Sequence, residues 1–361
     1  MKNVVFFVND LNAGGIENYL LRFLHHYDGK IVPTVVCKSA VFGDLEEKYR
    51  KIKHITLVPL KMGYFDVLGC RNTYLFLKNG NFDTAVDFTG NFAAFPLLMA
   101  KLAKIKTRIV FYRGATNHFE ETFFKKKYNS FLNFVVLNAA TSILSNSKAA
   151  LLFFFKKQND KRFEVIYNGI DASGFLNSDK NLREELNIPN DAFVISHVGR
   201  FTEAKNHKTI IETAIALCRQ NKEIYFILCG KNVDVNLKER VERENLCEKI
   251  KLLGYRSDVI LILNSSDAFY FPSLTEGQPN ALIEAMIVGL PFVASNIEPV
   301  KESVPEDFHQ FLVNPNDVSS AMEMLQLLFK DEVARKNMNL SQWAKEHYEP
   351  NYLFSKFYIK L

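Results

Sequence analysis

The strongest constraint on the fold of this 361-residue chain is an alternation of short apolar runs with longer amphipathic stretches, repeated from one end to the other. Such alternation is typical of βαβ units on a parallel sheet, whose strands are buried on both faces. We therefore expect an α/β protein made of two doubly wound halves, with a polar linker at residues 171–191. In the first half, strands are expected at residues 4–8, 32–37, 84–88, 108–112, 142–145 and 164–167, with a helix at 17–27. In the second half, strands are expected at 193–198, 224–229, 250–253, 268–271 and 291–295, with helices at 208–220 and from Pro279 onward.

Length and composition exclude several classes of protein. The chain is 48% hydrophobic and 24% charged, as is usual for a soluble protein of two domains. Its five cysteines form no C-x-x-C pair and its eight histidines no H-E-x-x-H motif, which argues against a disulfide framework or a zinc site. No stretch approaches 18 apolar residues, and the apolar run at residues 4–8 is too short for a signal peptide core. We therefore expect a cytoplasmic protein that does not span a membrane.

Charge is distributed unequally between the two halves. Residues 1–167 carry 24 Lys and Arg against 13 Asp and Glu, a balance of +11, whereas the remainder carries 21 against 27, a balance of −6. No nucleic-acid-binding motif accompanies the basic half, so nucleic acid is not the expected partner. An anionic membrane surface and an anionic acceptor both remain as explanations.

Two glutamates lie eight positions apart at the predicted start of a helix in the second half. Glu276 falls on a Gly/Pro loop and Glu284 in the second helical turn, because Pro279 suits the first helical position. The carboxylates can accept hydrogen bonds from hydroxyl groups, while the positive end of the helix favours an anion. This arrangement suits a nucleotide-activated sugar, which carries hydroxyls at both ends and a diphosphate between them.

A second loop of the same half carries cations. Gly199 follows a predicted strand and permits a tight turn, and Arg200 and Lys205 come after it. Arginine offers a planar fork of donors to phosphate oxygens, and lysine offers a compact positive charge. Because ligands of doubly wound sheets bind at the carboxyl ends of the strands, these cations and the two glutamates are expected at one site, in the cleft between the halves.

These motifs occur in an order that resembles the retaining glycosyltransferases of family four, which have the GT-B architecture of two Rossmann-like domains facing a central cleft. The resemblance covers nearly the whole chain and implies that residues 1–167, with a C-terminal crossover at 343–361, bind the acceptor. It implies that residues 168–342 bind the nucleotide sugar. The matching pieces are Gly14-Gly15-Ile16-Glu17, Asn168-Gly169-Ile170-Asp171, Val198-Gly199-Arg200 with Lys205, Cys229-Gly230, Leu253-Gly254-Tyr255, Phe271-Pro272-Ser273, Glu276 to Glu284, and Gly289-Leu290-Pro291-Phe292-Val293-Ala294-Ser295.

The resemblance also assigns roles to individual residues. Arg200 and Lys205 match the pair that binds the donor diphosphate. Glu276 matches the acid that contacts hydroxyls of the donor sugar, and Glu284 the acid that accepts the ribose hydroxyls. Other positions matched to the donor site are Gly14 and Gly15 in the N-terminal loop, Gly199, Tyr255 near the base, and the segment Gly277, Gln278, Pro279 and Asn280, whose backbone would face the sugar and distal phosphate.

The sequence departs from the family pattern at two places. Many members carry a histidine in the first-domain loop after the strand that here ends at Tyr112, and this chain offers both Arg113 and His118. Which of the two fills that place stays open, with His118 the candidate catalytic residue and Arg113 the candidate on the acceptor side. The usual glycine pair before a late acidic position is also changed, which leaves the role of Glu302 open.

Other functions were weighed against this resemblance. An NAD-dependent oxidoreductase is disfavoured because the loop at residues 12–15 lacks G-x-G-x-x-G. A GT-B nucleotide-sugar epimerase and a non-catalytic GT-B scaffold remain as alternatives. The expected reaction is metal-independent transfer of a hexose from a UDP- or GDP-linked donor to a glycan or lipid-linked acceptor, in bacterial surface-polysaccharide biosynthesis.

Two segments of the basic half join phenylalanines to lysines, at residues 123–128 and 153–157. Aromatic side chains at the headgroup level and lysines facing anionic lipid would make a peripheral membrane contact. Alternatively, these phenylalanines are core positions of two helices whose lysines face water.

Overall fold

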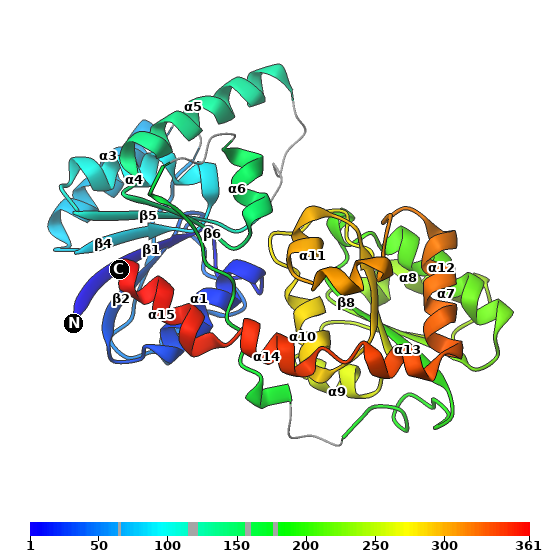
Figure 1. The fold of residues 1–361 in the computed structure, drawn as a ribbon. Helices are drawn as coiled ribbons and strands as arrows, with labels where there is room; N and C mark the ends of the chain where they lie inside the picture. The colour runs from blue at the N-terminus through cyan, green and yellow to red at the C-terminus, as the bar shows by residue number, and fades with distance from the viewer. Residues whose placement is uncertain (64–65, 115–121, 156–159, 176–179) are drawn as a thin grey trace. The chain divides into compact units, whose positions relative to one another are not determined.

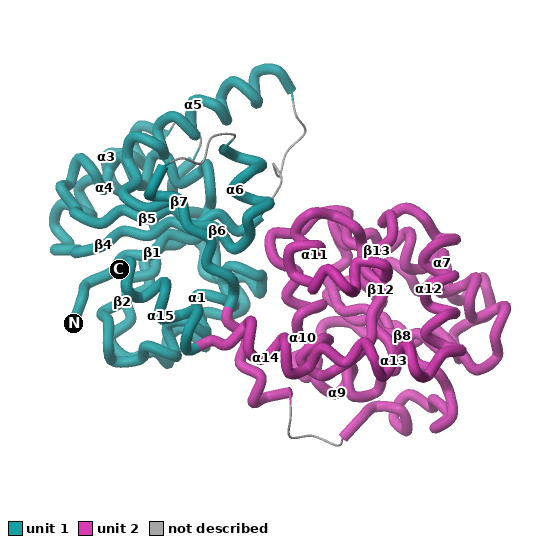
Figure 2. Tube along the Cα trace, in the orientation of Figure 1, with its two compact units in different colours: residues 1–168, 351–361 teal, residues 169–350 magenta. Residues whose placement is uncertain are grey.

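The computed structural model describes residues 1–63, 66–114, 122–155, 160–175 and 180–361. The described chain divides into two compact units, which Figure 2 shows in different colours. Unit 1 comprises residues 1–168 and 351–361, and unit 2 comprises residues 169–350. The expected boundaries were 167/168 and 342/343, so the chain returns to unit 1 eight residues later than the sequence suggested.

In its described residues, unit 1 contains one parallel sheet with the strand order β3-β2-β1-β4-β5-β6-β7. Its strands are β1 (Lys2–Val8), β2 (Ile31–Cys37), β3 (Thr56–Pro59), β4 (Thr84–Asp87), β5 (Thr107–Tyr112), β6 (Ser142–Ser145) and β7 (Phe163–Val165). Its helices are α1 (Gly15–His26), α2 (Glu46–Arg50), α3 (Val67–Asn79), α4 (Ala94–Leu102), α5 (Phe123–Ala139), α6 (Lys148–Phe154) and α15 (Pro350–Lys360).

The central strand β1 shows why this sheet is covered on both faces. Side chains of a strand alternate between faces, so a strand between two helical layers needs apolar residues at every position. Phe6 packs in the core with α1 and α15, whereas its neighbours Val5 and Phe7 pack in the core with α3 and α4. Figure 1 shows these two helical layers on opposite sides of the sheet.

Unit 2 contains a second parallel sheet with the order β10-β9-β8-β11-β12-β13 in its described part. Its strands are β8 (Phe193–Val198), β9 (Ile224–Cys229), β10 (Ile250–Leu253), β11 (Ala268–Phe271), β12 (Phe292–Ser295) and β13 (Leu312–Val313). Its helices are α7 (His207–Gln220), α8 (Val233–Arg243), α9 (Val259–Asn264), α10 (Asn280–Val288), α11 (Glu298–Glu302), α12 (Val318–Lys330), α13 (Glu332–Asn337) and α14 (Ser341–His347).

The expected α/β architecture with two doubly wound sheets is confirmed, but β3 and β13 were not predicted. The four residues of β3 are only half-buried or exposed and end in a proline, and β13 is two residues long. Neither segment therefore carries the continuous apolar run by which the other strands were recognised.

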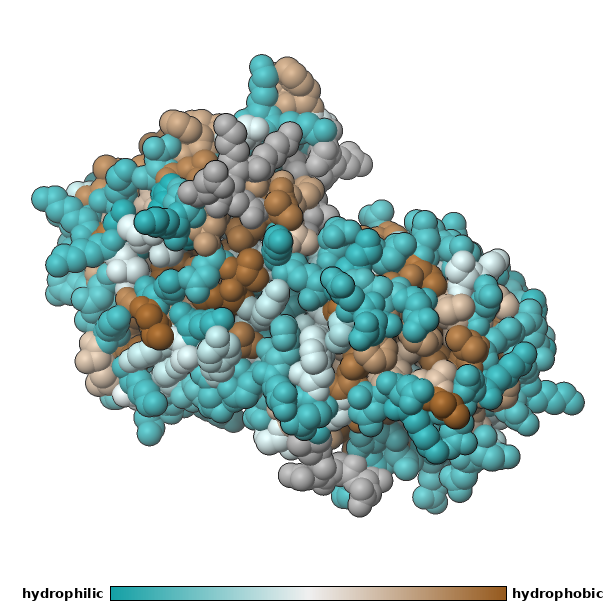
Figure 3. All heavy atoms as spheres, viewed as in Figure 1, coloured by the Kyte–Doolittle hydropathy of each residue, from teal (hydrophilic) through white to brown (hydrophobic). Residues whose placement is uncertain are grey.

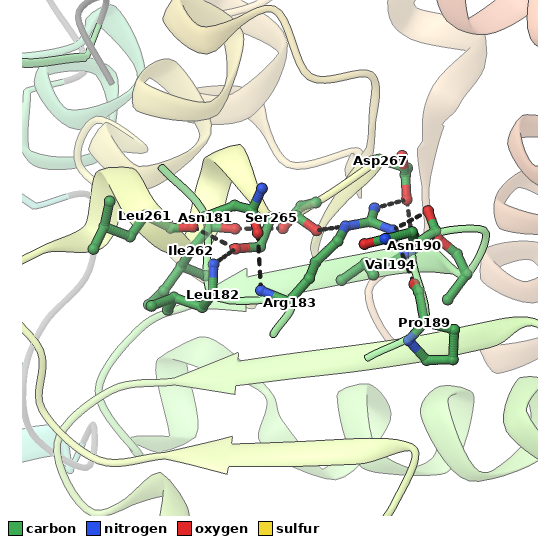
Figure 4. A network of polar contacts seen from close by, with 12 residues as sticks. Asn181, Leu182, Arg183, Pro189, Asn190, Val194, Leu261, Ile262, Ser265 and Asp267 are labelled. Carbon is green, nitrogen blue, oxygen red and sulfur yellow. Dashed lines mark hydrogen bonds and ion pairs between the residues drawn. The ribbon is translucent and has the colours of Figure 1, made fainter. Parts of the chain in front are cut away.

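A half-buried arginine anchors the segment that leads into unit 2. Arg183 Nη2 donates to Asp267 Oδ2 over 2.7 Å, and its Nε donates to the carbonyl oxygen of Ser265 over 3.1 Å (Figure 4). The same Asp267 oxygen accepts from the backbone N–H of Val194 at 2.7 Å. This network lies at the amino ends of β8 and β11, so it fixes the polar linker to the sheet and leaves the carboxyl ends open for other groups.

Helix α15 completes the core of unit 1 although it comes from the far end of the chain. Phe357 is fully buried, with its ring centroid 4.7 Å from Phe23 and 5.4 Å from Phe111. The hydroxyl of Thr84, in β4, donates to the carbonyl oxygen of Leu361 over 2.5 Å. The sheet of unit 1 is therefore closed on one face by residues that follow unit 2 in sequence.

Replacing Phe357 with alanine should lower the free energy of unfolding of unit 1 by roughly 3–5 kcal/mol, the usual cost of deleting a buried phenylalanine side chain. Urea unfolding monitored by circular dichroism measures this loss. The matched control is Ile359→Ala on the same helix, because Ile359 is 75% exposed. Equal unfolding midpoints for the two variants would contradict the packing of α15 on unit 1.

Candidate active site

In unit 2, the residues that the sequence singled out lie on loops at the carboxyl ends of neighbouring strands. Arg200 and Lys205 follow β8, Tyr255 follows β10, and Glu276 follows β11. The carboxyl ends of parallel strands meet at one edge of a sheet, where doubly wound proteins bind their ligands. The order of the strands thus brings together loops that are far apart in sequence, such as those that carry Lys205 and Glu276, 71 positions apart.

The loop after β8 passes very close to the loop after β9. The N–H of Gly199 donates to the carbonyl oxygen of Cys229 over 2.9 Å. Gly230 has a φ of +155°, and a β-carbon there would overlap the carbonyl oxygen of Gly199. Only glycine accommodates both conditions at position 230. Arg200, the next residue along, is thereby held at the edge of the sheet with its side chain exposed to solvent.

The buried Asn206 joins the two loops that carry the charged residues. It has a left-handed backbone conformation with φ of 55° and precedes α7. Its amide nitrogen donates to the carbonyl oxygens of Pro272, at 3.2 Å, and Pro315, at 2.7 Å. In addition, the N–H of Leu274 donates to the carbonyl oxygen of Ala204 over 2.8 Å. These bonds set the spacing between the loop after β8 and the loop after β11.

Lys205 and Glu276 form an ion pair across these two loops. Lys205 Nζ lies 2.5 Å from Glu276 Oε1 and 4.8 Å from the centroid of the Phe271 ring. The charges of these two residues therefore already balance each other before a ligand binds. A lysine carries three N–H donors and a carboxylate several acceptor positions, so both groups keep capacity for a ligand.

The segment from Gly277 to Asn280 forms the start of α10. Pro279 is the N-cap residue, with φ of −81° and ψ of 71°, and not the first helical residue that the sequence suggested. Its ψ lies outside the helical region, so the helix begins at Asn280. Gly277, Gln278 and Pro279 are buried. Glu284 lies in the second turn and is half-buried, as expected from its spacing.

Two neutral histidines lie beneath the loop after β8. His197 and His207 have ring centroids 5.2 Å apart, and His197 Nδ1 is 2.9 Å from the carbonyl oxygen of Tyr270. Burial, more than any charge, lowers the pKa of His207 to about 4 and lowers the pKa of His197. Both rings are therefore neutral at pH 7, so the local positive charge comes from Arg200 and Lys205 and not from the histidines.

In unit 1, Gly14 and Gly15 lie at the start of α1, where Gly14 is the N-cap. A β-carbon at Gly14 would overlap the carboxylate of Glu17, which therefore folds back over the first turn of the helix. The positive end of α1 already faces an acid of its own helix. The carboxylate of Glu17 lies at the end of a flexible side chain, so it can move away from the helix start. The two glycines lie on the segment that follows β1, where the sequence predicted a loop.

Arg113 follows β5, and its guanidinium carbon lies 3.8 Å from the centroid of the Tyr19 ring and 4.8 Å from that of Phe111. Its Nε and Nη1 atoms are buried and have no hydrogen-bond partner among the residues that the structure describes. Burial lowers the pKa of Arg113 to about 10, so the side chain remains a cation at pH 7. His118, the other candidate for this place, lies outside the described residues.

A cavity of about 460 Å³ lies beside Arg113 within unit 1. Most of its lining residues lie at or after the carboxyl ends of β1 to β5 or belong to the helices that cover these strands, so the cavity occupies the switch point of this sheet. Most lining side chains are aromatic or aliphatic. Sequence reasoning missed the polar members of this lining, which are Asn9, Lys38, Thr89, Asn91 and Asn129.

Lys38 illustrates why these residues were missed. Its amino group is buried and lies 3.0 Å from Asp87 Oδ2, and it also donates to the hydroxyl of Thr89. Burial lowers the pKa of Lys38, and the adjacent Asp87 opposes that shift. Lys38 and Asp87 are 49 positions apart in sequence. Each is a polar residue at the end of an apolar run, and this alone does not indicate that the two form a pair.

Comparisons with known proteins agree with this geometry. Residues 13–173 match the family described as Glycosyltransferase Family 4, and residues 178–347 match the family described as Glycosyl transferases group 1. The two matches follow each other in the order that the resemblance implied. The chain thus carries a Glycosyltransferase Family 4 domain followed by a Glycosyl transferases group 1 domain.

Individual relatives resemble this chain over different shares of their length. An Escherichia coli UDP-Gal:alpha-D-GlcNAc-diphosphoundecaprenol alpha-1,3-galactosyltransferase is 34% identical over 48% of this chain and 46% of its own, so the match spans about half of that relative. The putative glycosyltransferase EpsF of Bacillus subtilis is 26% identical over 82% of this chain and 79% of its own. Among solved structures, Anabaena HepE in complex with UDP and glucose has a TM-score of 0.82 at 19% identity, covering 99% of this chain and 98% of that one. This likeness confirms the GT-B fold.

Two further findings concern the described residues alone. They contain no group of three or more His, Cys, Asp or Glu side chains placed to hold a metal ion. They also contain no helix that is both long and apolar enough to cross a membrane.

Proposed function

We propose that this protein is a retaining, metal-independent hexosyltransferase that uses a UDP-linked sugar and acts in surface-polysaccharide biosynthesis. The observation that carries the proposal is the set of charged residues at one edge of the unit 2 sheet, with Arg200 and Lys205 on one loop, Glu276 on the next and Glu284 on the helix α10 that follows it. The choice of UDP is supported by the name of the Escherichia coli relative and by the ligands of HepE. The acceptor proposed by the same analogy is a lipid-diphosphate-linked sugar, reached from the cytoplasmic side.

The proposed reaction breaks the bond between the anomeric carbon and the leaving diphosphate and forms one to an acceptor hydroxyl on the same face. The proton of that hydroxyl passes to an oxygen of the leaving phosphate. Negative charge grows on the diphosphate, and preorganised cations aimed at such charge are the main catalytic device. Arg200 and Lys205 have that role, so the residues themselves provide the charge for which other enzymes use a metal ion.

Replacing Arg200 with alanine should lower kcat by roughly 10²–10³-fold, the usual effect of deleting one donor to developing negative charge. Transfer from radiolabelled UDP-hexose, or slow donor hydrolysis where the acceptor is not known, gives the rate. The matched control is Arg243→Ala on α8, because Arg243 is exposed and pairs with Glu239 within its own helix. A rate within threefold of wild type for Arg200→Ala would remove the diphosphate assignment.

Replacing Glu284 and replacing Glu276 should affect nucleotide binding and sugar transfer differently. Glu284→Ala should weaken UDP and UDP-sugar equally, by about 1.5–3 kcal/mol, because its proposed partner is the ribose common to both ligands. Glu276→Ala should spare UDP binding and reduce transfer, because its proposed partner is the hexose. Calorimetric titration with UDP and with UDP-glucose distinguishes a ribose contact from a hexose contact. The control is Glu239→Ala on α8, because the side chain of Glu239 is exposed. Normal UDP binding by Glu284→Ala would show that this residue does not contact the ribose.

A peripheral contact with an anionic membrane is also part of the proposal, and helix α5 supports it. Phe123, Phe124, Phe131 and Phe134 are 66%, 82%, 49% and 64% exposed. At 100° per residue these four side chains fall within an arc of about 100° on one face of the helix. The interpretation that the phenylalanines at the start of α5 are core positions is therefore wrong. In Figure 3, hydrophobic and hydrophilic side chains lie side by side at the free end of α5.

Charge on the same helix favours anionic lipid as the surface that covers these rings. Residues 125–127 are three consecutive exposed lysines in the first turn. Each lysine near an anionic surface contributes about 1 kcal/mol to binding, and aromatic rings insert at the headgroup level. On α6, Phe153 is 44% exposed, whereas Phe155, which follows the helix, is buried. Phe155 therefore cannot contact a membrane, and the lysines at 156 and 157 lie outside the described residues.

The protein should co-sediment with phosphatidylglycerol vesicles at low salt, be released by high salt, and not bind phosphatidylcholine vesicles. Replacing Lys125, Lys126 and Lys127 with glutamate should abolish binding and leave donor hydrolysis intact. The control variant carries Val235→Ser and Lys238→Glu on α8, where both residues are exposed. Equal binding to neutral vesicles, or none to anionic vesicles at low salt, would contradict the membrane contact.

A further inference from the structure

The cavity of unit 1 has the size and the position of a ligand site. Its volume of about 460 Å³ lies within the range of about 300–1,000 Å³ that is usual for small-molecule sites. It lies at the carboxyl ends of the strands, next to Ile16, which directly follows the glycine pair at the start of α1. Aromatic rings, among them Tyr112, Tyr128 and Phe95, line its walls and can stack on the apolar face of a sugar ring.

The polar side chains of the cavity differ in whether their hydrogen-bonding capacity is already used. Tyr112 donates to Asn91 Oδ1 over 2.8 Å, and Asn91 in turn donates to Asn129. Lys38 is held by Asp87, by Thr89 and by the carbonyl oxygen of Phe92, at 3.3 Å. These side chains already bond to groups of the protein, and the charge of Lys38 is cancelled by that of Asp87. They therefore give the cavity its shape and leave no charge of their own for a ligand.

Among the lining residues that the structure describes, Arg113 is the cation that no carboxylate pairs with. Two of its nitrogen atoms are buried without a partner there, although each such N–H costs free energy until it is bonded. The charged neighbours whose fields reach it are Arg22 and Glu17, both on α1, so the three side chains together carry one net positive charge. No Asp or Glu lines the described part of the cavity.

We infer that this cavity binds the acceptor and selects one that carries an anionic group next to its sugar, with Arg113 holding the anion and the aromatic walls holding the sugar. The inference rests on the proposed function and names the chemical class of its acceptor. The anion has two sources with the same chemistry, a diphosphate that links the sugar to a lipid and a carboxylate on the sugar itself. A guanidinium offers a planar fork of donors to either one.

Three synthetic probes with the same octyl chain test the inference. They are octyl-diphospho-N-acetylglucosamine, octyl glucuronide and the uncharged octyl N-acetylglucosaminide, each titrated calorimetrically into the full-length protein. The diphosphate probe should bind at least tenfold more tightly than the uncharged probe, and added salt should reduce that difference. This comparison uses only the wild-type protein, so it does not depend on the folding of any variant.

Arg113→Gln should reduce the affinity for the diphosphate probe by tenfold or more and leave the affinity for the uncharged probe unchanged. Arg113→Lys should restore part of the loss, because it returns the charge without the planar fork. Arg50→Gln is the control, since Arg50 is an exposed arginine of unit 1 that pairs with Glu46 within α2. Tighter, Arg113-dependent binding of the glucuronide than of the diphosphate probe would support the anion site and assign it to the sugar carboxylate.

The outcomes separate this inference from the function on which it rests. Equal affinity for charged and uncharged probes, or an equal loss of both in Arg113→Gln, overturns the acceptor site while UDP binding by unit 2 still supports a transferase. Conversely, Arg113-dependent binding of the diphosphate probe by a protein that binds no UDP-sugar supports the anion site and overturns the proposed transfer.

Discussion

The buried amide of Asn206 is the interaction on which the geometry of the unit 2 site depends. It bonds to Pro272, after β11, and to Pro315, after β13, from its own position between β8 and α7. A buried amide that loses one partner leaves an unsatisfied polar group, so the three segments are held together as a unit. This side chain helps to set the spacing between Arg200 and Glu276, together with the backbone bond from Leu274 to Ala204 and the ion pair of Lys205 with Glu276.

The fold could be predicted to the extent that each element carries its own pattern. Strands such as β1 and β8 are buried on both faces, so their continuous apolar runs are visible without any knowledge of their neighbours. Strand β3 has no such run, because it lies at the edge of its sheet and is half-buried or exposed. The position at which the chain returns to unit 1 could not be predicted from local sequence either. It depends on the packing of Phe354 and Phe357 in the core of unit 1.

The site was predictable where spacing along the chain fixes geometry and not where burial decides it. Eight positions between Glu276 and Glu284 place both beside the start of one helix, and the structure keeps that arrangement. Pairing across the sheet, as in Lys38 with Asp87, requires the strand order, which local pattern does not contain. The phenylalanines of α5 pose a related problem, because a face of large apolar residues has the same period whether it meets a core or an outside surface.

The position of α15 in unit 1 determines the order in which this protein can become complete during synthesis. Domains generally fold as units as the chain emerges from the ribosome, starting from the N-terminus. Here the core of unit 1 lacks Phe354, Phe357 and Leu361 until all of unit 2 has been translated. The first unit to begin folding is therefore the last to finish. Until then the aromatic side chains of α1 stay uncovered, and a nascent chain of this design needs protection at that face while unit 2 is made.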